Sequence, residues 1–259
     1  MIVTSPSPAP LRAQDQRAAL HDEAHVYLAC VDEYTESARW ADCAALLCQE
    51  EQERMSRFVF EKDRRLYAAA HALVRRALSR YADVPVVAWR FARGAFGRPE
   101  ISIPAGLPLR FNLSHTRGLC ACVVTRTIAC GVDVEQARPL DDLLGLAQSS
   151  LSAREYAALL DAEGSQQKDR FYRYWTLKEA YIKARGLGLS LPLRSFSFLF
   201  EGGEAIQLAL DNEAQVRASD WQFHHRRVGP EYHLSVALER GAGPDRRVVV
   251  RWTDPTRVS

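Results

Sequence analysis

Two acidic side chains lie two residues apart in a short apolar segment, Gly131-Val-Asp133-Val-Glu135. Alternate side chains of a β-strand point to the same face, so these two carboxylates would lie side by side with Cα atoms about 7 Å apart. Such a pair repels itself unless a cation or proton lies between its members, and hard oxygen ligands favour Mg²⁺, Mn²⁺ or Ca²⁺ over Zn²⁺. The pair indicates either a divalent metal site or two solvated acids at a strand end.

A third acid follows about forty residues later on a predicted helix. Trp175, Glu179 and Lys183 recur at steps of four residues and share one helical face. Alone, the Glu and Lys are a common surface pair worth about 0.2 to 0.5 kcal/mol. Combined with the two strand acids, they would form a centre in which carboxylates hold Mg²⁺, the metal shares the oxygens of a pyrophosphate, and the lysine faces the phosphate.

Another polar group ends an apolar segment at Asn112-Leu-Ser114-His115-Thr116. We expect a turn here, and its hydroxyls and imidazole are suited to phosphate oxygens, although a structural or solvated histidine is the alternative. A hydrolase that uses Ser114 and His115 as nucleophile and base is excluded, because adjacent residues do not usually reach each other and the sequence contains no nucleophile elbow.

These residues require strands and helices to position them. Apolar periodicity predicts a helix from about Asp63 to Tyr81, with Asp63 as N-cap, and a second from about Gln167 to Arg185 that Gly186 ends. Ser152 and Glu155 have the spacing of a capping box. Strands are expected in the remaining apolar segments, which are Val26–Cys30, Val86–Phe91, Leu109–Leu113, Leu119–Thr125, Ala129–Val134, Phe196–Phe200, Ala205–Leu210, Trp221–His224, Tyr232–Leu238 and Val248–Trp252.

The order of these elements suggests an α/β protein of two similar halves. Residues 1–13 contain three prolines and two serines, which predicts a disordered tail, with regular structure starting near His25. The first half is expected to span residues 14–126 and the second half residues 127–259.

The composition excludes several classes of protein. With 34 basic and 32 acidic side chains and a formal net charge of +2, the chain is too balanced to bind nucleic acid chiefly through charge. The six cysteines have no CxxC spacing and follow no secretory leader, so we expect free thiols in the cytoplasm. A hydrophobic content of 47% is typical of soluble globular proteins, and no membrane partner is expected.

Taken together, the motifs resemble those of the surfactin-type 4′-phosphopantetheinyl transferases. The resemblance rests on Gly97-Arg98-Pro99, Asn112-x-Ser114-His115, Gly131-x-Asp133-x-Glu135 and Trp175-x-x-Lys178-Glu179-Ala180-x-x-Lys183, and it extends from about Glu53 to Phe198. It implies an α/β (α+β) fold of two pseudo-twofold-related subdomains in a monomer, with the active site between them. The first subdomain would bind the coenzyme A 3′-phosphate, and the second would carry the metal and the catalytic helix.

The resemblance also implies roles for individual residues. Asp133, Glu135 and Glu179 are expected to bind Mg²⁺, with Mn²⁺ as a substitute, and either Glu179 or a metal-bound water would act as base. Lys183 would stabilise the pyrophosphate charge. The remaining expected coenzyme A contacts are Arg54, Arg93, Arg98, Ser114, His115 (on the 3′-phosphate) and Lys178. Arg98 departs from the lysine that is usual in the family, which keeps the charge and changes the donor geometry.

The activity implied by this resemblance is transfer of the phosphopantetheine arm of coenzyme A to a serine of an acyl or peptidyl carrier protein, with release of 3′,5′-ADP. The alternatives are a Mg²⁺-dependent phosphohydrolase or nucleotidyl transferase that uses the same three acids, and a coenzyme A binding module without activity. The sequence leaves open which carriers, from fatty-acid, polyketide, peptide or siderophore synthesis, are substrates.

Overall fold

The chain folds into two units, each built around its own sheet. The computed structural model describes residues 3–4, 12–31, 37–94, 96–201, 205–211, 217–240 and 243–254. One unit comprises Met1–Ile128 with Arg246–Ser259, and the other comprises Ala129–Asp245. The mixture of helices and sheets confirms the predicted fold class.

The elements of the first unit are β1 (Val3–Thr4), α1 (Ala13–Ala19), β2 (Glu23–Cys30), α2 (Ser37–Ala45), α3 (Gln49–Ser56), α4 (Glu61–Ser79), β3 (Arg90–Arg93), β4 (Pro99–Ile103), β5 (Arg110–Thr116), β6 (Leu119–Thr125) and β12 (Arg247–Trp252). The elements of the second unit are β7 (Cys130–Gln136), α5 (Leu143–Ser150), α6 (Ala153–Leu160), α7 (Ser165–Arg185), β8 (Phe196–Glu201), β9 (Ala205–Leu210), β10 (Trp221–Val228) and β11 (Tyr232–Glu239).

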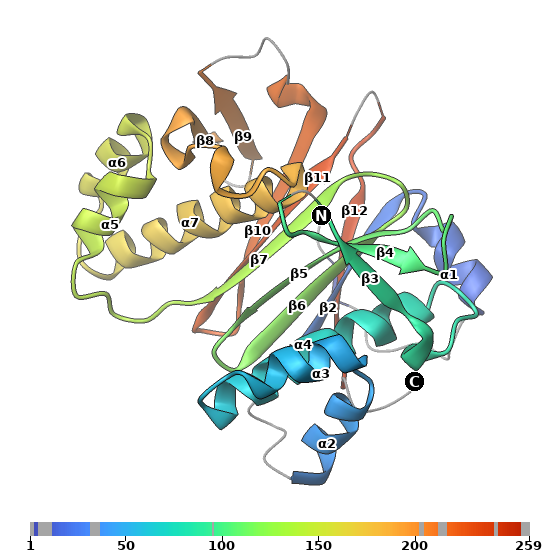
Figure 1. Cartoon of the computed structure of the whole chain (residues 1–259). Coiled ribbons are helices and arrows are strands. Elements are labelled where there is room, and N and C mark those ends of the chain that lie inside the picture. Colours follow the sequence, from blue (N-terminus) through green and yellow to red (C-terminus); the bar gives the residue numbers. More distant parts are fainter. Residues whose placement is uncertain are drawn as a thin grey trace. The chain divides into compact units, whose positions relative to one another are not determined.

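The sheet of the first unit has the order β1-β12-β2-β6-β5. Helix α4 packs against β6, β5 and β2 (Figure 1). Its apolar residues Leu73, Ala77 and Leu78 join Trp89 and Phe111 in one buried cluster. The helix starts two residues earlier than predicted, with Phe60 as N-cap, so that Asp63 lies in its first turn.

Strand β12 changes the expected division of the chain. It pairs in parallel with β2 and with β1, although the sequence placed all of residues 127–259 in the second half. Val248, Val249 and Val250 are buried in this sheet. Pairing between segments more than two hundred residues apart leaves no local signal in the sequence, which is why this partner was missed.

The N-terminal prediction is also corrected where the structure describes it. Val3–Thr4 forms β1, and the short helix α1 precedes β2, so regular structure begins before His25. Residues 1–2 and 5–11 of the predicted tail lie outside the described residues. Within Val86–Phe91, the predicted strand, the chain first forms a 3₁₀ turn over Val86–Ala88, and β3 starts at Arg90.

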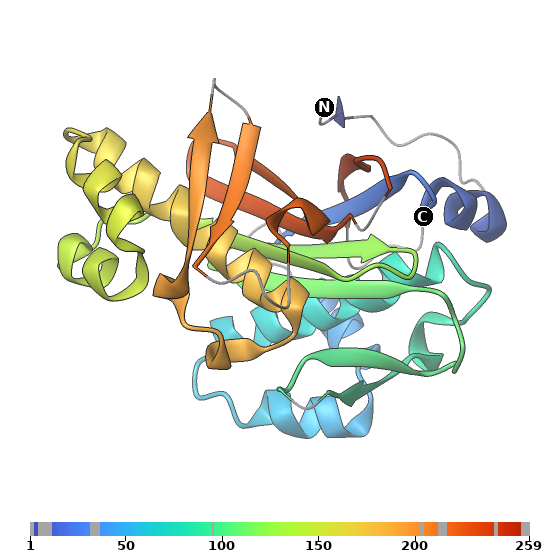
Figure 2. The same cartoon turned by 90° about the horizontal axis from the view of Figure 1, so that it is seen from above.

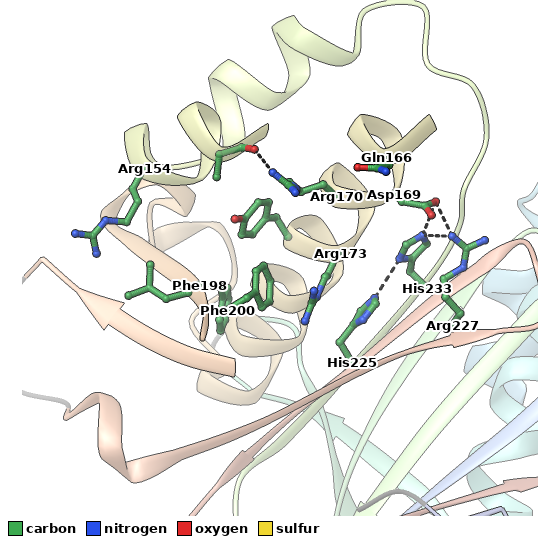
Figure 3. Close-up of a pocket in the computed structure, with 13 residues that line it drawn as sticks. Arg154, Gln166, Asp169, Arg170, Arg173, Phe198, Phe200, His225, Arg227 and His233 are labelled. Carbon is green, nitrogen blue, oxygen red and sulfur yellow. Dashed lines mark hydrogen bonds and ion pairs between the residues drawn. The ribbon is translucent and has the colours of Figure 1, made fainter. Parts of the chain in front are cut away.

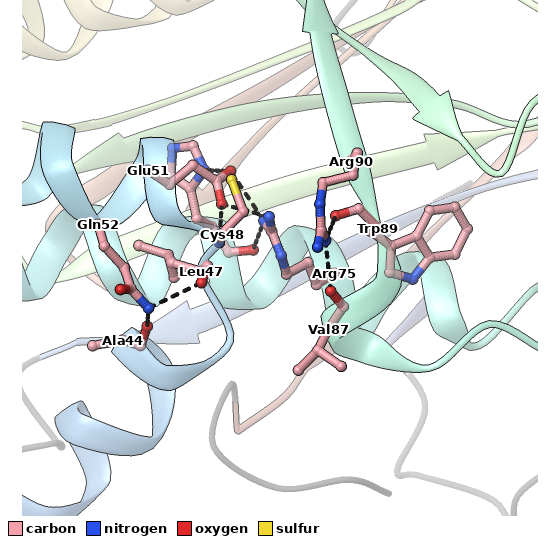
Figure 4. Close-up of polar contacts among 10 residues, drawn as sticks. Ala44, Leu47, Cys48, Glu51, Gln52, Arg75, Val87, Trp89 and Arg90 are labelled. Carbon is pink, nitrogen blue, oxygen red and sulfur yellow. Dashed lines mark hydrogen bonds and ion pairs between the residues drawn. The ribbon is translucent and has the colours of Figure 1, made fainter.

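Helix α3 is anchored on α4 by a buried charge cluster (Figure 4). Arg75, which is fully buried, donates to both carboxylate oxygens of Glu51, and His71 Nδ1 lies 2.9 Å from Glu51 Oε1. Burial alone would raise the pKa of Glu51, but the contacts with His71 and Arg75 outweigh it and lower the pKa to about 2. The charged cluster holds α3 at a defined place on the first unit.

The second unit has a three-stranded antiparallel sheet in the order β10-β11-β7. Helix α7 crosses β7 and β11 along one face, and α5 and α6 pack against α7 (Figure 2). Tyr181 of α7 meets Phe196, Trp221 and Phe223 edge to face, with ring centroids 5.1 to 5.8 Å apart. Gly186 ends the helix with a φ of 64°, which confirms the predicted left-handed cap.

Within the described ranges, no helix combines the length and the apolar composition that a membrane span requires.

Candidate active site

A glycine on β7 allows α7 to approach the sheet very closely. A Cβ atom at Gly131 would overlap the carbonyl oxygen of Ala180 and the amide nitrogen of Ala184. Because Asp133 and Glu135 follow at steps of two, they lie on the same face of the strand as this glycine. The Gly-x-Asp-x-Glu segment therefore directs both carboxylates toward α7.

The helix brings a lysine and a third acid to this face. Lys183 Nζ donates to Asp133 Oδ1 at 2.6 Å, and Asp133 is only 3% exposed. Burial and the charge of Asp133 raise the pKa of the half-buried Glu179, while Lys183 opposes this shift. Asp133, Glu179 and Lys183 thus form one interacting group, although they come from two elements some fifty residues apart.

Glu135 lies two residues beyond Asp133 on the same face of β7. It is opposite His233 in the β7–β11 register and is half-buried. Tyr172, two turns before Glu179, has a pKa raised by burial and also by the charge of Glu135. In the part of the chain that the structure describes, no group of three or more His, Cys, Asp or Glu side chains is close enough to hold a metal ion.

The chemistry of these donors nevertheless suits a hard divalent cation. Asp133 and Glu179 meet where α7 packs on β7, Lys183 forms an ion pair with Asp133 there, and Glu135 lies on the same face of β7. Mg²⁺ usually takes one or two protein carboxylates and fills its other positions with water and phosphate oxygens. Asp133, Glu135 and Glu179 therefore fit the ion by type.

Lys178 does not have the role that the sequence suggested. It is fully buried, and its ammonium lies 2.7 Å from each of three oxygens: Glu155 Oε2 and the carbonyls of Leu193 and Phe196. These acceptors use all three of its N–H donors. The predicted contact of Lys178 with coenzyme A is wrong in this structure, because consecutive helical residues point about 100° apart and Lys178 faces the core.

The partner of Lys178 organises the second unit. Ser152 and Glu155 form the predicted capping box of α6, with Ser152 N donating to Glu155 Oε2 at 2.9 Å. Glu155 Oε1 also accepts from Phe198 N at 2.8 Å. One carboxylate thereby joins α6, α7 and β8. The sequence showed the capping box and gave no signal for the other partners.

The predicted anion-binding turn is part of a strand. Ser114 and His115 lie in β5, and the turn follows Thr116. Ser114 is buried and His115 is exposed, because adjacent strand residues point to opposite faces. The two side chains therefore do not form one anion-binding turn, and the exposed His115 is the one that a ligand in solvent can reach.

The three predicted arginines occupy two places in the first unit. Arg93 and Arg98 lie near the turn between β3 and β4, where Arg93 pairs with Pro99. Arg98 donates to the carbonyl of Phe111 at 3.4 Å and lines a cavity of about 240 Å³. Arg54 is exposed in the last turn of α3.

Known proteins match both units. The family model of the 4′-phosphopantetheinyl transferase superfamily matches residues 129–237, and that of the 4′-phosphopantetheinyl transferase N-terminal region matches residues 34–127. The matched range is wider than the expected Glu53 to Phe198.

Individual relatives are similar over most of their length. The 4′-phosphopantetheinyl transferase Sfp of Bacillus subtilis is 36% identical over 221 residues, which cover 80% of this chain and 94% of that protein. The 4′-phosphopantetheinyl transferase HetI of Nostoc sp. is 36% identical over 172 residues, which cover 66% and 72%. A crystal structure of a holo-(acyl-carrier-protein) synthase from Bacillus anthracis aligns with 44% of this chain and 98% of its own, at 16% identity and a TM-score of 0.37. The sequence relatives establish that the chain belongs to the 4′-phosphopantetheinyl transferase superfamily.

Proposed function

We propose that this enzyme transfers the 4′-phosphopantetheine arm of coenzyme A to a serine of an acyl or peptidyl carrier protein and releases 3′,5′-ADP. The proposal rests on one observation in a member of this family. Where α7 approaches β7 at Gly131, the helix brings Glu179 and Lys183 to Asp133. A cytoplasmic location is part of the proposal, since all six cysteines are free thiols.

Asp133, Glu135 and Glu179 are the residues that would hold Mg²⁺ in this proposal. When bound, the ion would neutralise the pyrophosphate of coenzyme A and polarise its oxygens. Lys183 would add a positive charge where negative charge develops on the leaving oxygen. The Lys183 ammonium already contacts the Asp133 carboxylate, so α7 does not need to move far to direct this lysine to a phosphate.

The proposed reaction is a displacement at phosphorus. The carrier serine hydroxyl attacks the β-phosphorus of coenzyme A, the bond from that phosphorus to the bridging oxygen breaks, and 3′,5′-ADP leaves with that oxygen. The hydroxyl proton passes to the Glu179 carboxylate. Burial and Asp133 raise the pKa of this group, which makes it a stronger proton acceptor than an exposed glutamate.

The direct test is mass spectrometry of a carrier protein incubated with the enzyme, coenzyme A and Mg²⁺. We expect a mass increase of one phosphopantetheine group, and none when a chelator is present. Consumption of coenzyme A at the same rate without any carrier would instead indicate a phosphohydrolase. Coenzyme A binding that is unchanged in chelator, with no turnover, would indicate a binding module.

His115→Ala should raise the KM for coenzyme A about 10- to 100-fold with little change in kcat, because a hydrogen bond to a charged phosphate contributes about 1.5 to 3 kcal/mol. The control uses 3′-dephospho-coenzyme A, for which the variant and the unaltered enzyme should have the same KM. An equal loss with both substrates, or a loss of kcat at saturating coenzyme A, would contradict the placement of His115 on the 3′-phosphate.

A further inference from the structure

The second unit contains a large cavity that Asp133, Glu179 and Lys183 do not line. Its volume is about 740 Å³, and residues of α6, α7, β8, β10 and β11 line it (Figure 3). Arg170 and Arg173 contribute from α7, and they precede Glu179 by nine and six residues. At 100° per residue these positions lie about 180° and 120° around the helix from Glu179. The cavity therefore faces a different side of α7 from the candidate active site.

Among the described residues, no carboxylate forms an ion pair with Arg173. The guanidinium carbon of Arg173 lies 3.5 Å from the centroid of the Phe200 ring, and its buried Nε has no hydrogen-bond partner in the described part of the chain. Burial lowers the pKa of Arg173, and the charge of Arg170 lowers it further. A guanidinium that stacks on an aromatic ring keeps its in-plane N–H donors available for an oxyanion.

Two further arginines increase the positive charge. Arg170 lies one helical turn before Arg173 and donates one hydrogen bond to the carbonyl of Ala158. Arg154 is exposed on α6. Among the described residues, none of the three arginines forms an ion pair with a carboxylate.

The remaining polar lining does not neutralise these arginines. Among the described lining residues, the acidic side chain is that of Asp169. It is paired with Arg227 and not with the three arginines, since its Oδ1 lies 2.5 Å from Arg227 Nη1 and 3.5 Å from His233 Nε2. Burial lowers the pKa of His225 to about 3 and that of His233 to about 4, so both rings are neutral at pH 7. The cavity thus has a net positive charge from its arginines.

Apart from Gln166 and Tyr174, the rest of the wall is apolar. The ring of Phe200 on β8 lies under Arg173, as Figure 3 shows, and Ala158 of α6 lies beside Arg170. The volume falls within the range of about 300 to 1,000 Å³ that is usual for small-molecule sites and greatly exceeds the size of a phosphate ion. A ligand that fills it must have an apolar part as well as an anionic group.

We propose that this cavity is a second ligand site, which binds a phosphate monoester with an aromatic or apolar body. Arg170 and Arg173 bind the phosphate group, whose double negative charge matches two adjacent guanidinium groups. The organic part lies against Phe200 and Ala158. This site is independent of the proposed transfer reaction. Its ligand is distinct from the coenzyme A that would bind beside Asp133, Glu179 and Lys183.

Calorimetric titration of the full chain with phenyl phosphate, inorganic phosphate and phenol tests the proposal. We expect phenyl phosphate to bind at least about tenfold more tightly than either fragment, because it alone provides both the charged and the apolar contact. Arg173→Gln should weaken phenyl phosphate binding about 10- to 100-fold, the loss expected for a charge-assisted hydrogen bond. Arg194→Gln, which changes an exposed arginine outside the cavity, should leave the affinity unchanged.

Two comparisons separate this site from the active site. Phenyl phosphate should bind the Glu179→Gln variant and the coenzyme A-saturated enzyme as tightly as the free enzyme, while Arg173→Gln should retain the rate of carrier modification. Unchanged binding in Arg173→Gln, or competition between phenyl phosphate and coenzyme A, would overturn the proposal. If Arg173→Gln fails to fold, a crystal structure of the unaltered protein with phenyl phosphate tests the proposal instead. A phosphate bound anywhere other than at Arg170 and Arg173 would overturn the proposal.

Discussion

Replacing Glu179 with glutamine should lower kcat for carrier modification by about 10²- to 10⁴-fold, the usual contribution of a general acid or base. The substitution keeps the side-chain shape but removes a carboxylate charge and the proposed proton acceptor. Carrier modification followed by mass spectrometry at saturating coenzyme A gives the rate. Glu163→Gln, at an exposed position just before α7, is the matched control and should keep normal turnover.

The same variant should be at least as stable as the unaltered protein. The folded-state pKa of Glu179 is raised, first by burial and then by Asp133, so the folded state disfavours the ionised form. Glutamine removes this penalty above the folded pKa, and the difference should vanish as the pH falls below the unfolded value of about 4.5. Thermal unfolding from pH 4 to 8 measures this. Near-normal turnover, or loss of stability at pH 7, would contradict the assigned role of Glu179.

Replacing Lys178 with methionine should destabilise the protein by about 3 to 5 kcal/mol, because it leaves the buried carboxylate of Glu155 without its cation. Urea unfolding followed by fluorescence gives the free energy of unfolding. Lys168→Met, at a half-buried position of the same helix, is the control and should change stability much less.

A double substitution tests whether the loss arises from the unpaired charge. Glu155→Gln combined with Lys178→Met should recover part of the stability, since neither partner then carries a charge. The folded Lys178→Met enzyme should keep its KM for coenzyme A. A raised KM with unchanged stability would instead restore the coenzyme A contact that the sequence suggested.

Local patterns in the sequence were sufficient for most strands and for the helices α4, α6 and α7. The apolar periodicity located α4 and α7, Gly186 marked the end of α7, and the capping box at Ser152 and Glu155 formed as expected. These features depend on interactions between residues at most a few positions apart, which the sequence displays directly. The alternation of Asp133 and Glu135 likewise showed that both acids share one face of a strand.

Contacts between distant segments required the tertiary structure. Lys178 and Glu179 are neighbours in one motif, yet one is buried against Glu155 and the other faces Asp133, since a helix turns consecutive residues to different sides. Strand β12 joins β2 through backbone hydrogen bonds that no side-chain pattern encodes.

The sequence by itself determined the acids, the lysine and the elements that carry them, because the chemistry and periodicity of these residues are local properties. The tertiary structure decided which of them meet. Gly131 lets α7 approach β7, and this close packing brings Lys183 to Asp133 and leaves Arg173 over Phe200 on another side of the same helix. Such positions follow from the packing of whole elements, which depends on all of their contacting residues together.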